Sequence, residues 1–209
     1  MVVRFSDEEF AKLKKMLLVF GWGHQVAMTK FNILHQDLIN FQGSNPIEHI
    51  KGRIKSPESI AAKLKRLDLG ITAENAKNHL TDISGIRVIC PFAKDIYVIV
   101  GILTAMPDWT VLTQKDYISK PKPSGYRSYH VILSVPIYYS GITEHIPVEI
   151  QIRTAAMDFW SSMEHQVRYK YKERVPQHLS DELVVCADKI AELDERMLLI
   201  HEIISLINQ

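Results

Sequence analysis

A segment in the middle of the chain constrains the fold most, because it predicts two long strands joined by a tight turn. Residues 128–138 are rich in β-branched and aromatic side chains, Ser140 and Gly141 form a turn signal, and residues 145–153 predict the return strand. Within the return strand, the sequence VEIQIR alternates apolar and polar side chains. It therefore predicts one polar sheet face that carries Glu149, although the outer face of an antiparallel edge strand would show the same pattern.

Helical periodicity surrounds this hairpin. Ser6 opens a capping box that predicts a helix to about Phe20, and Gly21 to Gly23 should interrupt it before a second amphipathic helix ending near Phe41. Further patterns predict a strand from residue 47, a helix from Pro57, a strand around 86–90, a helix at 94–106, a strand at 109–112, a helix after Thr154 and a last helix from about Asp181. The predicted fold is α/β (α+β), a mixed, mainly antiparallel sheet flanked by helices.

Composition narrows the class of protein. The chain has 209 residues, of which 46% are hydrophobic, so it fits one globular domain with appended helices. A net charge of +1 makes coating of nucleic acid by bulk charge improbable, so an anion site must come from local clustering. Cys90 and Cys186 form no CxxC motif, which suits a reducing compartment without structural zinc. Without a signal pattern or an apolar run of about 20 residues, we expect a cytoplasmic protein that does not enter membranes.

The loop KDYISKPKPSGYRSYH, at residues 115–130, mixes cations with aromatic rings. Pro121 and Pro123 exclude a helix or a central strand, and Gly125 permits a close backbone approach. Cations beside aromatic rings suit a ligand with both phosphates and a base, and a solvated basic turn is the plainer interpretation. The side chains concerned are Lys115, Lys120, Lys122, Arg127, Tyr117, Tyr126 and Tyr129.

A second basic cluster lies where a strand leads into a helix. The strand delivers Lys51, Arg53 and Lys55 to a helix that Ser56 should cap. Ser59, Lys63 and Arg66 then share one helix face, and the helix N-terminus adds partial positive charge, so the cluster is a candidate phosphate site; a solvated basic face is the alternative.

Two carboxylates complete the pattern. Asp82 precedes the strand that contains Arg87, and Glu149 lies on the polar face of the return strand. Two carboxylates from different strands near a basic loop are what a magnesium-dependent phosphoryl-transfer site needs, because hard oxygens bind the ion and cations bind the phosphates.

Five blocks of this chain, in matching order, resemble the RelA/SpoT-type synthetase domain. They are IEHIKGRIKSPESI, DISGIRVIC, KDYISKPKPSGYRSYH, VEIQIRTAAMDFW and EHQVRYKYK. The resemblance is strongest to the stand-alone small alarmone synthetases, and nearer to their RelP form than to RelQ. It implies a synthetase domain with a nucleotidyltransferase-like fold, and a synthesis-only enzyme that transfers the β,γ-pyrophosphate of ATP to the 3′-hydroxyl of GDP or GTP, giving ppGpp or pppGpp and AMP.

The same resemblance implies roles for individual residues. Asp82 and Glu149 match the magnesium-binding acids, and Glu149 is also the candidate base. The ATP-binding positions are Arg53, Lys55, Ser59, Lys63, Arg66, Arg87 and Lys115. The positions for GDP or GTP are Lys122, Ser124, Tyr126, His130 and Gln151, with Tyr126 stacking on guanine and Ser124 replacing an Asn that many members have.

We expect residues 1–45 to form N-terminal helices, 46–175 the catalytic domain and 176–209 an oligomerisation helix. An apolar stripe with a repeat of about 3.5 residues runs along the last helix and is wider than one neighbouring helix covers, which indicates an interface; packing on the chain's own N-terminal helices is the alternative. The resemblance implies a homotetramer built by the N- and C-terminal helices. Single-stranded RNA is a possible further ligand. Two alternatives stay open from the sequence: an enzyme that transfers a nucleotidyl group with the same two acids, and a catalytically silent RNA-binding protein.

Overall fold

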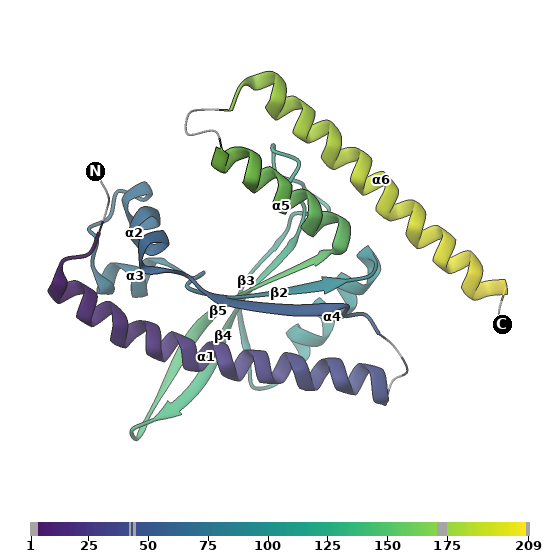
Figure 1. The fold of residues 1–209 in the computed structure, drawn as a ribbon. Coiled ribbons are helices and arrows are strands. Elements are labelled where there is room, and N and C mark those ends of the chain that lie inside the picture. The colour runs from purple at the N-terminus through teal and green to yellow at the C-terminus, as the bar shows by residue number, and fades with distance from the viewer. Residues whose placement is uncertain (1–3, 42, 44, 171–174, 208–209) are drawn as a thin grey trace.

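A central mixed sheet organises the protein. The computed structural model describes residues 4–41, 43, 45–170 and 175–207 (Figure 1). Within these residues, five strands form one sheet in the order β1-β2-β5-β4-β3, in which β2 and β5 are parallel and the other pairs are antiparallel. The strands are β1 His49–Ile54, β2 Ser84–Cys90, β3 Thr110–Asp116, β4 Tyr129–Tyr139 and β5 Ile142–Thr154. Because β5 is the middle strand, its polar face is not the outside of an edge strand, and the edge-strand alternative is wrong.

Helices cover the sheet on both sides. The long α1 runs along one face, while α5 and α6 lie on the opposite side (Figure 1). The buried residues of α1, such as Phe20 and Phe31, join those of α4, such as Ile99 and Leu103, in one core with the apolar side chains of the strands. The helices are α1 Asp7–Asn40, α2 Pro57–Arg66, α3 Ala73–His79, α4 Ala93–Ala105, α5 Ala155–Lys170 and α6 Gln177–Ile207.

Strand register decides which side chains share a face. In the sheet, Gly85 lies between Arg53 of β1 and Glu149 of β5, and Gln151 lies between Arg87 of β2 and His130 of β4. Residues opposite one another on paired strands point to the same side, so these polar residues share one face. Their apolar neighbours, including Ile86, Val148 and Ile150, are buried on the face that α1 covers. The alternation in VEIQIR thus separates the core from the site, as predicted.

Several helix signals are confirmed. The Ser6 side chain accepts a hydrogen bond from the Glu9 backbone N–H at the start of α1, and Ser56 does the same for Ser59 at the start of α2. The Thr154 hydroxyl accepts from the Met157 N–H where β5 passes into α5. These caps satisfy N–H groups that have no partner within the helix.

The predicted interruption at Gly21 to Gly23 is wrong, because α1 continues through it. A Cβ on Gly23 would lie 2.7 Å from Cβ of Ile146, so this glycine allows the helix to approach β5 closely. The short helix α3 was not predicted, β3 is longer than expected and includes Lys115, and α6 begins at Gln177 instead of Asp181.

Two further findings concern membrane-spanning helices and the extent of the described residues. No helix in the described ranges combines the length and the apolar character that a membrane span requires. The side chains of the last resemblance block from Arg168 onwards lie outside the described residues.

Candidate active site

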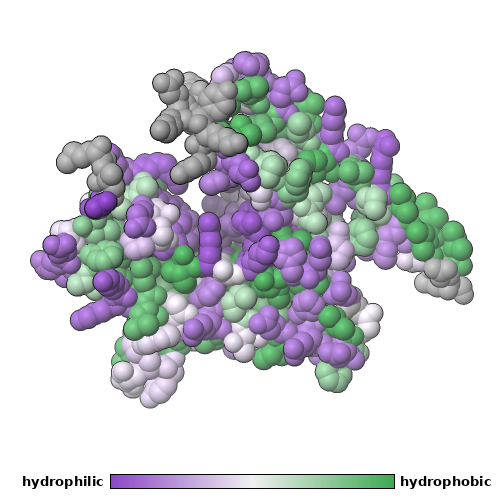
Figure 2. Space-filling model, in the orientation of Figure 1, coloured by the Kyte–Doolittle hydropathy of each residue, from purple (hydrophilic) through white to green (hydrophobic). Residues whose placement is uncertain are grey.

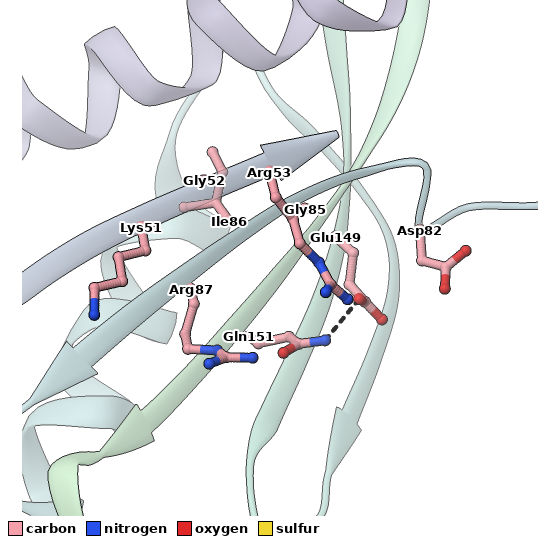
Figure 3. A pocket seen from close by; sticks show the side chains of 9 residues that line it. All are labelled: Lys51, Gly52, Arg53, Asp82, Gly85, Ile86, Arg87, Glu149 and Gln151. Carbon is pink, nitrogen blue, oxygen red and sulfur yellow. Dashed lines mark hydrogen bonds between the residues drawn. The ribbon is translucent and has the colours of Figure 1, made fainter. Parts of the chain in front are cut away.

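A cavity of about 220 Å³ opens on the polar face of the sheet. Figure 3 shows that its walls come from β1, from β2 with the turn before it, and from β5, and Figure 2 shows polar residues gathered around a hollow in this face. The lining residues are Lys51, Gly52, Arg53, Asp82, Gly85, Ile86, Arg87, Glu149 and Gln151. Because Gly85 carries no side chain, the space between Arg53 and Glu149 stays open.

Two lysines contact the same carboxylate oxygen of Asp82. Its Oδ2 accepts from Lys55 of the segment after β1 and from Lys63 of α2, the latter at 2.7 Å. Its buried Oδ1 has no hydrogen-bond partner among the described residues. Burial alone would raise the pKa of Asp82, but the hydrogen bonds and charges of the two lysines outweigh it and lower the pKa. An ionised carboxylate with an unused oxygen is suited to bind a cation.

Glu149 occupies the centre of the site. Gln151 Nε2 donates to its Oε2 at 2.8 Å, and His130 Nδ1 lies 3.4 Å from its Oε1. Burial would raise the pKa of Glu149, and contacts with His130 and Gln151 reverse this and lower it, while the charge of Asp82 acts in the opposite sense. The two carboxylates are therefore close enough to influence each other.

The two acids fit a magnesium ion that also binds substrate. In the part of the chain that the structure describes, no group of three or more His, Cys, Asp or Glu side chains could form a metal site from protein alone. Magnesium commonly takes one or two carboxylates and completes its shell with phosphates and water. The unpartnered Oδ1 of Asp82 beside Glu149 matches that requirement.

The basic loop packs beside Glu149 and is internally connected. The Tyr126 hydroxyl and His130 Nε2 lie 2.8 Å apart, and Arg153 Nη2 donates to the same hydroxyl at 2.6 Å. A guanidinium can only donate, so the tyrosine proton is available for His130 Nε2, which leaves a proton on Nδ1 facing Glu149. Lys122 Nζ lies 4.5 and 4.7 Å from the ring centroids of Tyr117 and Tyr126.

Other predicted residues lie at the margins. Lys115 is exposed at the end of β3 and is paired with His130 across the sheet. Ser59 and Arg66 are exposed on α2, where the Ser56 hydroxyl donates to Ser59 Oγ, and Ser124 lies in the turn before Gly125. The structure thus brings Arg53, Lys55, Lys63 and Arg87 to the cavity and its acids, whereas Ser59, Arg66 and Ser124 are not among the lining residues.

Two residues that sequence reasoning did not assign complete the site. Arg153 of β5 is only 2% exposed and bonds to Tyr126, Gln151 and Asp158. Asp158 of α5 also pairs with Arg87 at 2.8 Å. The alternation in VEIQIR does place Arg153 on the same face as Glu149, so the signal was present; its burial against α5 was not visible in the sequence.

Comparison with known proteins gives consistent matches. Residues 52–174 match the model of the region found in RelA / SpoT proteins. The GTP pyrophosphokinase YwaC of Bacillus subtilis (strain 168) is 46% identical over 185 residues, covering 88% of each chain.

Solved structures match as well. The crystal structure of small alarmone synthetase 2 from Bacillus subtilis aligns with a TM-score of 0.82 at 44% identity, over 90% of this chain and 97% of that one. Small alarmone synthetase 1 from the same organism, bound to its product pppGpp, aligns with a TM-score of 0.84 at 33% identity, over 91% and 97%. Its complex with AMPCPP gives a TM-score of 0.78 at 29% identity, over 93% and 98%. This chain belongs to the RelA/SpoT family and has the fold of the small alarmone synthetases.

Proposed function

We propose that this protein transfers the β,γ-pyrophosphate of ATP to the 3′-hydroxyl of GDP or GTP. It is a GTP pyrophosphokinase, and its product is (p)ppGpp. The observation that supports the residue-level mechanism best is the position of Glu149, between the cavity lined by Arg53 and Arg87 and the loop that contains Tyr126. One group therefore borders both the site for a polyphosphate and the site for a guanine nucleotide.

The donor half binds the polyphosphate by charge. Arg53 and Arg87 line the cavity, and Lys55 and Lys63 lie at its edge on Asp82. The transferred group is highly anionic, so neutralising its charge and fixing its position contribute most of the rate enhancement. A magnesium ion bound by Asp82 and Glu149 would supply further neutralisation of the phosphate oxygens. Ser59, Arg66 and Lys115 would bind more peripheral parts of ATP.

The acceptor half presents the 3′-hydroxyl to the β-phosphorus. Tyr126 would stack on guanine, with Lys122, Ser124, His130 and Gln151 around the nucleotide. Glu149 accepts the hydroxyl proton as the new oxygen–phosphorus bond forms, while the bond from the β-phosphorus to the bridging oxygen breaks and AMP leaves with that oxygen. Because the pKa of Glu149 is lowered, it is ionised at neutral pH and is a weak base, so its contribution through proton transfer is modest.

Product analysis tests this function directly. The protein is incubated with ATP, magnesium and either GDP or GTP, and the nucleotides are separated by anion-exchange chromatography. We expect ppGpp or pppGpp and AMP in equal amounts. Release of pyrophosphate together with an adenylylated product would identify the nucleotidyl-transfer alternative and overturn the proposal.

We also propose that the protein assembles into a homotetramer through its terminal helices. The second half of α6 exposes a row of large apolar side chains, seen at the projecting end in Figure 2, which include Leu193, Met197, Ile200, Ile203, Ile204 and Ile207. Exposed apolar surface of this extent marks an interface. Ile200→Asp should dissociate the assembly, because burying an unpaired carboxylate costs several kcal/mol. Light scattering after size-exclusion chromatography checks this, and an unchanged mass would place α6 outside the interface.

Two further proposals concern the location of the protein and RNA as an additional ligand. A cytoplasmic location agrees with Cys90 and Cys186, which are both free thiols. Single-stranded RNA, if it binds, would use the basic segments 51–66 and 115–127. A gel-shift measurement with a labelled single strand, with and without GDP as competitor, checks this second proposal.

A further inference from the structure

Arg153 is buried, and each of its three guanidinium nitrogens donates at least one hydrogen bond. Its Nη2 donates to the Tyr126 hydroxyl at 2.6 Å and to Gln151 Oε1 at 2.7 Å. Its Nε donates to Ser128 Oγ at 3.4 Å and its Nη1 to Asp158 Oδ1 at 3.1 Å. A planar guanidinium fixes the directions of all these bonds together. Because its nitrogens are already engaged by protein, Arg153 would act through two side chains that we assign to the acceptor site, Tyr126 and Gln151, whose orientation it fixes.

Asp158 joins this cluster to the donor half of the cavity. Its Oδ1 accepts from Arg153 Nη1 and also from Arg87 Nη1, at 2.8 Å. The carboxylate lies in the first turn of α5, and its side chain is 20% exposed. One negative charge therefore serves two guanidinium groups, one in each half of the site.

Arg87 has capacity left for a ligand. Its side chain is 32% exposed, it lines the cavity, and its buried Nε has no partner among the described residues. A polyphosphate that reaches the cavity carries several negative charges and competes with Asp158 for the Arg87 donors. When Arg87 turns to the phosphate, Asp158 pairs with Arg153 alone and holds it, with Tyr126 and Gln151, more firmly.

We propose that Asp158 and Arg153 are positioning residues that make the binding of the two nucleotides cooperative, because Asp158 is shared between Arg87 on the donor side and Arg153 on the acceptor side. This inference rests on the proposed function. Cooperativity of this kind is a coupling free energy, so each nucleotide should raise the affinity for the other by the same factor.

Calorimetric titration measures the coupling. GDP is titrated into the magnesium-loaded protein with and without saturating AMPCPP, whose methylene group in place of the α,β-bridging oxygen prevents transfer. For the wild type we expect GDP to bind at least about fivefold more tightly in the presence of AMPCPP. Asp158→Asn should reduce this ratio to near one, because a neutral amide attracts neither guanidinium strongly.

A matched control separates coupling from simple loss of an acidic residue. Asp188→Asn removes another arginine partner, since Arg127 Nη2 lies 3.0 Å from Asp188 Oδ1, but Asp188 is 65% exposed and belongs to α6. Exposed pairs contribute little. We expect the wild-type coupling ratio in this variant.

A second variant tests the same idea without removing the carboxylate. Arg153→Lys retains a positive charge for Asp158 but cannot bond to Tyr126, Gln151 and Asp158 together, so the ratio should again approach one. In steady-state kinetics it should raise the KM for GDP by a larger factor than it lowers kcat, because it loosens Tyr126 and Gln151 without removing Glu149. This variant decides the question if Asp158→Asn does not fold, as judged by circular dichroism.

The outcomes are distinguishable from failure of the proposed function. If the wild type binds neither GDP nor AMPCPP, the proposed function is wrong. If both bind but the wild-type ratio is one, or if Asp158→Asn and Arg153→Lys keep the wild-type ratio, the coupling proposal is overturned while the proposed function stands.

Discussion

The proposed donor and acceptor halves of the site are built in opposite ways. On the donor side, Arg53 is exposed on β1, and the buried Nε of Arg87 has no hydrogen-bond partner within the described residues. On the acceptor side, Tyr126 is bonded to both Arg153 and His130, and its ring meets Tyr117 edge-on. A polyphosphate is recognised by charge, which tolerates mobile side chains, whereas a base is recognised by shape, which requires fixed ones. Substitutions should therefore act through charge on the donor side and through geometry on the acceptor side.

The largest effect is expected from substitution of the two carboxylates at the reacting centre. Asp82→Asn and Glu149→Gln should each lower kcat by about 100-fold or more, because each removes a charge at the reacting centre. The fold should persist, since both side chains border the cavity and neither substitution opens a void in the core. Initial rates of AMP formation at saturating magnesium measure the effect. Near-wild-type turnover in either variant would show that the assignment of the acids is wrong.

Tyr126→Ala tests whether the acceptor side depends on one fixed ring. Losing a stacking platform costs about 1–3 kcal/mol, which corresponds to an increase of about 5- to 150-fold in the KM for GDP. The KM for ATP should change much less. Tyr138→Ala is the control, because Tyr138 is 76% exposed near the β4–β5 turn. Equal increases in both KM values would instead indicate collapse of the loop.

Arg53→Ala examines the donor side in the same way. A lost charge-assisted hydrogen bond of about 1.5–3 kcal/mol should raise the KM for ATP by about 10- to 150-fold and leave the KM for GDP nearly unchanged. Arg66→Ala, on the exposed end of α2, should raise the KM for ATP by no more than about fivefold. Steady-state kinetics with each substrate varied would measure both. A larger effect of Arg66 than of Arg53 would relocate the phosphates toward α2.

Gly125→Ala probes how the acceptor loop depends on α6. Gly125 has φ +86°, and a Cβ there would lie 2.6 Å from Cβ of Ala187 in α6. We expect a loss of about 1–3 kcal/mol in the free energy of unfolding from overpacking and about 1 kcal/mol or more from the left-handed backbone.

Urea denaturation gives the stability, and the KM for GDP should rise with the loss. Adding Ala187→Gly should restore only the packing part. Gly101→Ala, where a Cβ meets nothing within 4 Å on the helix α4, is the matched control and should not destabilise the protein. Wild-type stability of Gly125→Ala would mean that α6 does not constrain this loop.

Structural roles that depend only on residues nearby in the sequence could be predicted. The caps at Ser6 and Ser56 act within one turn, and the alternation around Glu149 follows from the two-residue repeat of a strand. Gly23 was misinterpreted as a helix break, because its reason for being glycine is the distant Ile146. The role of Asp158 was missed for the same kind of reason, since its two arginine partners meet only in the folded sheet.

The last helix is a different case. A repeat of about 3.5 residues predicts an apolar stripe along α6 that is wider than one neighbouring helix covers, and Leu193, Met197 and Ile200 are more than half exposed. Among the described residues, α6 contacts mainly α5 and, towards its C-terminal end, the start of α4. These two helices do not cover the apolar side chains in the second half of α6. Helical periodicity predicts which residues form the apolar face of a helix, whereas the packing of the other helices determines which of them are buried.

The division into two halves is tested most directly by hydrogen–deuterium exchange of the wild-type protein with magnesium and one nucleotide at a time. AMPCPP alone should slow exchange in residues 49–66 and 82–88, because its phosphates would bind between β1, α2 and β2. GDP alone should slow exchange in residues 117–130, because the base would order the loop of Tyr126. Protection of residues 49–66 by GDP with no effect on 117–130, or identical protection patterns for both ligands, would show that the site is not divided in this way.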